Sequence, residues 1–207
     1  MVMNKQEPVV YIIDDEFVIR DSLTLLLESA GHTVKSYASA EDFLDGFNPT
    51  QPGCLILDVK MPVMSGLELQ EELVRRMVNI PIIFMSGNSE IPDTVKALKA
   101  GAVDFLEKPF GNDVLQGLIK EAIEKDIRNK EKNLGQAVLQ QRIARLTPRE
   151  KEVLTLVVKS HSNKEAARIL NVSHRTIDVH RARIMEKMQA QDIAELVTIA
   201  MQCGVVV

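Results

Sequence analysis

The sequence predicts an α/β domain with a five-stranded parallel sheet, followed by a small all-α domain. In the first half, short apolar runs alternate with amphipathic segments five times, which is typical of repeated βα units. Between residues 146 and 207 there are four helical segments with capping signals. Residues 1–127 carry a net charge of −10 and residues 128–207 a net charge of +6. We therefore expect two modules, the basic one being a candidate for nucleic-acid binding.

The predicted strands are apolar runs without polar alternation, as expected for strands that are covered on both faces. They span residues 8–13, 33–37, 54–58, 81–85 and 102–108. The predicted helices span residues 17–31, 40–47, 66–77 and 92–101, and a further helix begins near Asn112. In the first helix, Val18, Leu23, Leu26 and Leu27 should face the core, and Gly31 should end the helix. Ser39 can cap the second helix.

The last of these helices has no turn signal before Gly135. Its predicted core stripe consists of Val114, Leu115, Leu118, Ala122 and Ile123, and apolar residues become sparse after Glu124. We interpret residues 1–123 as the first domain and 124–145 as a charged, largely helical linker able to self-associate. Residues 146–207 form the second domain.

The second domain should begin its helices at capping residues. Thr147 with Glu150, and Ser162 with Glu165, are capping boxes, Ser173 can cap the third helix, and a fourth helix follows near Asp192. The three-residue turn "NVS" between the second and third helices is typical of a helix-turn-helix. Ser160 stands before the second helix at a position where glycine is favoured, so we expect it to weaken that turn slightly.

Acidic, hydroxyl and basic side chains follow several strands of the predicted sheet. Asp14 and Asp15 come after the first strand, Asp58 ends the third, Ser86 follows the fourth and Lys108 ends the fifth. The carboxyl ends of parallel strands form the ligand-binding edge of such sheets. Clustered carboxylates suit Mg²⁺, and a carboxylate can act as a nucleophile toward phosphorus. We therefore expect phosphoryl transfer to Asp58, with Mg²⁺ bridging Asp15 and the phosphoryl group, and Lys108 and Ser86 contacting phosphoryl oxygens.

Residues 8–125 resemble the receiver domain of bacterial response regulators. The likeness lies in the acid pair, in "VKMPVMSG" after Asp58, in Ser86 and in "KAGAVDFLEKPF" around Lys108. It implies a sheet of order 2-1-3-4-5 and phosphorylation of Asp58 by a sensor histidine kinase. It also implies a Mg²⁺ site, a switch pair and a cis peptide bond. The implied Mg²⁺ ligands are Asp14, Asp15, Asp58 and the Lys60 backbone carbonyl. The implied switch pair is Ser86 and Phe105, and the implied cis peptide bond precedes Pro109. Where Phe105 stands, many members have Tyr, so this residue can signal only by packing.

Residues from Leu146 to about Met201 resemble the LuxR-type DNA-binding domain, and the pairing of the two halves is most similar to the FixJ branch of the NarL/FixJ regulators. "LTPREKEVL", "SNKEAA" and "RTIDVHRARIMEKM" carry this likeness. In the third helix the predicted buried stripe is Ile177, Ile184, Met185 and Met188, and the opposite face would enter the major groove. The expected DNA contacts are Lys164, Arg175, Thr176, Asp178, Val179, His180, Ala182, Arg183 and Lys187.

Two of these contacts leave alternatives open. Asp178 could accept a hydrogen bond from cytosine N4, or it could instead orient a neighbouring Arg. His180 could contact the DNA backbone, or it could pack between helices. The sequence does not distinguish these roles.

Together the two likenesses imply a phosphorylation-dependent transcriptional regulator, whose only chemistry is its own phosphoryl transfer and autodephosphorylation. Without phosphate the basic domain would be masked or monomeric. Phosphorylation would remodel the face of helix 4, strand 5 and helix 5 and produce a homodimer that binds promoter DNA, with RNA polymerase left open as a further partner. No apolar run approaches the roughly 18 residues of a membrane span, and no signal peptide is evident. We expect a cytoplasmic protein without a membrane partner.

Three other functions can be weighed against this one. A phosphatase of the haloacid dehalogenase kind needs a second Asp two residues after its nucleophile, but Lys60 stands there. A flavodoxin-like carrier needs a phosphate loop rich in Gly, Ser and Thr after its first strand, but the sequence there is "DDEF". A third alternative keeps the receiver and assigns the second domain to protein or RNA binding, which DNA-binding experiments can test.

Overall fold

The computed structural model describes residues 6–87 and 91–205, and the side chains of residues 91–94 are not among those described. The chain divides into two compact units, Met1–Lys130 and Glu131–Val207. This division falls within residues 124–145, the segment predicted to be a linker. Among the residues that the structure describes, none of the helices is both long and apolar enough to span a bilayer.

The first unit contains the predicted parallel sheet, with the strand order β2-β1-β3-β4-β5. The strands lie within one residue of the predicted bounds, except β5, which is shorter at its N-terminal end by two residues. They are β1 (Val9–Ile13), β2 (Thr33–Tyr37), β3 (Gly53–Asp58), β4 (Ile82–Ser86) and β5 (Asp104–Glu107). All neighbouring pairs are parallel, so the carboxyl ends of the strands lie at one edge of the sheet.

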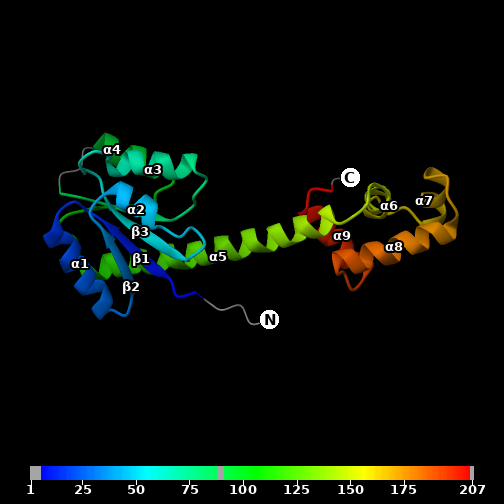
Figure 1. Ribbon diagram of the computed structural model, residues 1–207, viewed down its shortest axis with the longest axis horizontal. Coiled ribbons are helices and arrows are strands. Elements are labelled where there is room, and N and C mark those ends of the chain that lie inside the picture. The colour runs from blue at the N-terminus through cyan, green and yellow to red at the C-terminus, as the bar shows by residue number, and fades with distance from the viewer. Residues whose placement is uncertain (1–5, 88–90, 206–207) are drawn as a thin grey trace. The chain divides into compact units, whose positions relative to one another are not determined.

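Helices cover both faces of this sheet (Figure 1). They are α1 (Phe17–Ser29), α2 (Ala40–Gly46), α3 (Gly66–Arg75), α4 (Ile91–Lys99) and α5 (Asn112–Ala144). Alternate residues of β1 enter two different cores. Tyr11 packs with residues of α2, α3 and α4, whereas Ile12 packs with residues of α1 and α5. Burial on both faces explains why the strands were continuous apolar runs.

Two valines predicted to be core residues are exposed instead. Val18 in α1 is 71% exposed and Val114 in α5 is 55% exposed, while Leu23, Leu27 and Leu115 are buried as expected. Both valines lie in the first turn of a helix that follows a loop at the carboxyl edge of the sheet. The helix starts beyond the end of the strands, so the sheet does not cover its first turn.

Helix α5 runs without interruption through Gly135. Its residue Asp126 is fully buried in the first unit, where it accepts a hydrogen bond from the backbone N–H of Gly53 at 2.9 Å and forms an ion pair with Lys130. Further along α5, Leu139 and Ile143 pack against the core of the second unit. Residues of the predicted linker therefore contribute to the packing of each unit.

The second unit contains α6 (Pro148–Val158), α7 (Asn163–Ile169), α8 (His174–Met188) and α9 (Ile193–Gln202). The predicted caps are confirmed, including capping boxes of Thr147 with Glu150 and of Ser162 with Glu165. The buried side chains of α8 are Ile177, Ile184 and Met188, and Met185 packs against the same core while remaining partly exposed. These helices stand in the order that a helix-turn-helix requires, with α8 as its second helix.

Candidate functional site

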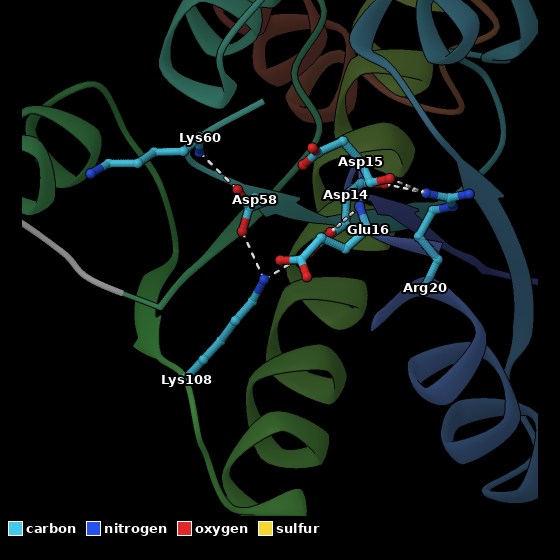
Figure 2. Close-up of polar contacts among 7 residues, drawn as sticks. All are labelled: Asp14, Asp15, Glu16, Arg20, Asp58, Lys60 and Lys108. Carbon is cyan, nitrogen blue, oxygen red and sulfur yellow. Dashed lines mark hydrogen bonds and ion pairs between the residues drawn. The ribbon is translucent and has the colours of Figure 1, made fainter. Parts of the chain in front are cut away.

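The candidate site lies at the carboxyl edge of the sheet, where three predicted residues come together (Figure 2). The Lys108 ammonium donates to Asp14 Oδ2 at 2.7 Å and to Asp58 Oδ1 at 2.8 Å. Asp14 is fully buried and Asp58 almost so. One cation, placed directly after β5, thus neutralises two carboxylates that follow β1 and end β3.

Backbone N–H groups fix the second oxygen of each carboxylate. Glu16 N–H donates to Asp14 Oδ1 at 2.9 Å, and Lys60 N–H donates to Asp58 Oδ2 at 2.8 Å. The Lys60 side chain points away from the site (Figure 2). Each carboxylate is therefore held by the shared Lys108 ammonium and by one backbone N–H. These hydrogen bonds orient the carboxylate without filling every lone pair.

Arg20 stabilises the acidic loop, although the sequence analysis did not single it out. Its Nη1 donates to the backbone carbonyls of Asp14 at 2.7 Å and Asp15 at 3.0 Å. A basic residue in the first turn of a helix is unfavourable for the helix dipole. Arg20 stands five positions after Asp15, and a basic residue near the start of a helix that follows an acid pair was the available signal that it serves the loop.

The electrostatics of the site follow from burial and from this pairing. Burial raises the pKa of the Asp58 carboxyl above its usual range, and Asp14 adds to the rise, although Lys108 and the Lys60 N–H oppose it. Burial alone would lower the pKa of the Lys108 ammonium, but its hydrogen bonds to Asp14 and Asp58 outweigh this and raise it. Lys108 is therefore a cation at neutral pH.

The acidic residues fit a hard divalent cation in their chemistry. Over residues 6–87 and 91–205, no group of three His, Cys, Asp or Glu side chains is arranged as a metal site. Asp14 and Asp58 both bind the Lys108 ammonium. Asp14 and Asp58 together therefore already hold one cation. The exposed Asp15 carboxylate has no hydrogen-bond or ion-pair partner within the described part of the chain. Figure 2 shows Asp15 turned away from Arg20 and toward Asp58. All three supply the oxygen ligands that Mg²⁺ prefers.

The predicted switch residues lie on neighbouring strands beside this site. Ser86 is the last residue of β4, and its backbone carbonyl accepts a hydrogen bond from Lys108 N–H at 2.8 Å. Phe105 on β5 is half-buried and stacks on Phe84, with 6.1 Å between the ring centroids. The Lys108–Pro109 peptide bond is cis, as the likeness to receiver domains implied.

The second unit presents the predicted nucleic-acid face on α8. Arg175, Asp178, Val179, Ala182 and Arg183 are all exposed, on the side opposite to the buried stripe. Lys164 on α7 is exposed as well. Thr176 is half-buried, and its hydroxyl lies 2.7 Å from that of Ser173.

Three of the predicted contacts have particular surroundings. The polar partners of Asp178 among the described residues are Asn163 and His174 rather than an Arg residue. Lys187 donates to the buried Glu150 carboxylate at 2.7 Å, so a contact with DNA phosphate would require this ion pair to break. His180 is half-buried, and its Nδ1 has no hydrogen-bond partner among the described residues.

Comparisons with known proteins cover nearly the whole chain. The profile of the response regulator receiver domain matches residues 10–120, and that of the bacterial regulatory proteins of the luxR family matches residues 144–200. The chain is 42% identical to the transcriptional regulatory protein FixJ of Bradyrhizobium diazoefficiens, over 94% of this chain and 95% of that protein. It is 42% identical to the response regulator TmoT of Ectopseudomonas mendocina, over 95% and 90% respectively. The low-resolution structure of the response regulator StyR superposes with a TM-score of 0.89 at 39% identity, over 95% of this chain and 99% of that one.

Proposed function

Because the chain belongs to the response regulators that join a receiver domain to a LuxR-type DNA-binding domain, we propose that Asp58 is the residue at which phosphorylation controls this transcriptional regulator. The observation that carries the proposal is the contact of the Lys108 ammonium with Asp58 Oδ1 at 2.8 Å. It puts a fixed positive charge beside a nearly buried carboxylate that still has lone pairs open to an incoming phosphoryl group.

The roles of the chain's own residues follow from this geometry. Asp58 Oδ1 attacks the phosphorus and the donor's leaving group departs, so the product is an aspartyl phosphate. Lys108 then binds a phosphoryl oxygen and compensates the charge gained. The Lys60 N–H keeps Oδ2 in place, and Arg20 keeps the acidic loop in place. Ser86, the last residue of β4, would donate its hydroxyl to another phosphoryl oxygen.

Mg²⁺ is the cofactor that suits the acidic residues of this site. Asp14, Asp15, Asp58 and the Lys60 backbone carbonyl would hold it. When bound, Mg²⁺ supplies positive charge that favours the approach of an anionic phosphoryl group. The same site would support autodephosphorylation, which is hydrolysis of the aspartyl phosphate by water.

Ser86 and Phe105 would pass the signal to the face formed by α4, β5 and α5. When Ser86 turns to the phosphoryl group, the vacated space can admit the Phe105 ring, which now stacks on Phe84. Because Phe105 has no hydroxyl, the change reaches the surface only as altered packing. A homodimer formed through this face would carry two DNA-binding units. These would read two half-sites spaced by about one turn of DNA.

The DNA contacts would come from α7 and α8. Arg175, Arg183 and Lys164 supply exposed cations for phosphates, and Thr176 and His180 supply polar contacts to the backbone. Asp178, Val179 and Ala182 lie nearest the base edges in a major-groove complex. A sensor histidine kinase and promoter DNA are the partners that this family membership implies, and RNA polymerase is a further one that we propose.

Phosphorylation of the full chain by acetyl phosphate and Mg²⁺ tests the proposal. Intact-mass spectrometry should show a phosphorylated wild type and an unmodified Asp58→Asn variant. Asp45→Asn is the matched control, because Asp45 is an exposed acid of α2 outside the site. Light scattering and DNA binding should respond to acetyl phosphate in wild type and in Asp45→Asn only. A phosphorylated Asp58→Asn variant that dimerises like wild type would refute Asp58 as the acceptor.

A further inference from the structure

The Asp178 carboxylate is held from two sides within the second unit. Asn163 Nδ2 donates to Asp178 Oδ1 at 2.6 Å, and His174 Nδ1 lies 3.0 Å from Asp178 Oδ2. Asn163 is the first residue of α7 and His174 the first residue of α8. The contact from Asn163 therefore joins the two helices of the helix-turn-helix through the side chain of a residue on the proposed DNA face.

These two contacts restrict the side chain but leave it open to a partner. The Asp178 side chain is 50% exposed. A carboxylate has about four lone-pair sites, and the described residues engage one site on each oxygen. Contacts at both oxygens restrict the rotamer, so the remaining lone pairs have a defined direction. A free carboxylate on a helix surface would instead sample several rotamers and lose entropy on binding.

We propose that Asn163 and His174 are positioning residues that hold Asp178 as a fixed acceptor for the amino group of a cytosine in the major groove. This inference rests on the proposed DNA binding by the second unit. Cytosine presents only its N4 donor there, whereas adenine presents its amino donor beside the N7 acceptor, which repels a carboxylate.

The test begins with the sequence preference of the intact protein. The full chain, phosphorylated with acetyl phosphate, is used to select sites from random duplex DNA. Affinity is then measured for the selected site and for each single-base change. If no sequence is selected, the proposed function fails and this inference fails with it. If a sequence is selected, Asp178→Ala should lose about 5- to 100-fold of discrimination at one cytosine and little elsewhere.

The positioning role is tested by double-mutant cycles. Asn163→Ala and His174→Ala should each lower discrimination at the same cytosine by about 2- to 10-fold, and should have no further effect once Asp178 is Ala. Discrimination is a ratio of two affinities measured on one preparation, so a partly unfolded variant does not alter it. Lys164→Ala is the contrasting variant, because loss of a phosphate contact weakens binding to all sites alike.

Two results would overturn the inference while leaving the proposed function intact. One is that, within the selected site, Asp178→Ala changes the base preference at every position equally or at no position. The other is an effect of Asn163→Ala and His174→Ala that persists at full size in the Asp178→Ala background, because these residues would then act independently of the carboxylate.

Discussion

The Lys108 ammonium nitrogen lies 2.8 Å from Asp58 Oδ1, although the two residues are 50 positions apart in the sequence. The sheet creates this contact, since β3 and β5 flank β4 and end at the same edge. The same nitrogen neutralises Asp14.

Loss of Lys108 should destabilise the first unit. Lys108→Ala leaves two carboxylates without their cation, of which Asp14 is fully buried, and we expect the free energy of unfolding to fall by about 3 kcal/mol. Lys60→Ala is the matched control, because the Lys60 side chain points away from the site (Figure 2). Urea titrations with and without Mg²⁺ measure both effects. Mg²⁺ should restore part of the stability lost in Lys108→Ala, and equal stability of the two variants would contradict the pairing.

Ionised Asp58 should reduce the stability of the unphosphorylated first unit. Because burial raises the pKa of Asp58 in the folded state, ionisation costs more when folded than when unfolded. Asp58→Asn should therefore raise the melting temperature at neutral pH. The difference from wild type should shrink as pH falls through the folded pKa and vanish below the unfolded one. Melting curves at a series of pH values test this, and a difference that grows toward acid would give the pKa shift the opposite sign.

Loss of the Lys187 side chain should lower the stability of the second unit, whereas loss of the Lys164 side chain should affect DNA binding. Lys187→Ala leaves the Glu150 carboxylate, which is 2% exposed, without its cation, so the free energy of unfolding should fall by about 1–3 kcal/mol. Lys164→Ala removes an exposed side chain and should change stability by less than about 0.5 kcal/mol. In DNA-binding titrations Lys164→Ala should reduce the salt dependence, as expected for a lost phosphate contact. If instead Lys164→Ala lowered the stability and Lys187→Ala reduced only the salt dependence, Lys187 would be the phosphate contact and Lys164 the structural cation.

Ser160→Gly should stabilise the second unit by about 0.5–1 kcal/mol. Ser160 follows α6 with a φ of 61°, a left-handed conformation that glycine adopts without steric cost. The greater flexibility of glycine in the unfolded chain offsets part of this gain. Thr155→Gly, inside α6, is the control and should lose about 1 kcal/mol. A thermal melt that shows Ser160→Gly to be less stable than wild type would argue against strain at this turn.

Much of the fold could be predicted because its signals are local or periodic. Continuous apolar runs predicted all five strands, and Ser39, Thr147, Ser162, Ser173 and Asp192 marked helix starts that the structure confirms. The family match agrees with the predicted regulator rather than with the phosphatase or flavin-carrier alternatives. Periodicity erred at Val18 and Val114, because it identifies the apolar side of a helix but not where the covering sheet ends.

For the site, too, the sequence predicts some features and only the tertiary structure decides the others. By itself the sequence determined which groups stand at the strand ends, since Asp14, Asp58, Ser86 and Lys108 each directly end or follow an apolar run. Only the tertiary structure decided which groups pair. It brought Lys108 to Asp14 and Asp58, Asp126 to the Gly53 N–H, and Asn163 to Asp178. Such pairs join residues distant in the chain, and their geometry depends on the packing of whole elements, which no local pattern of residues records.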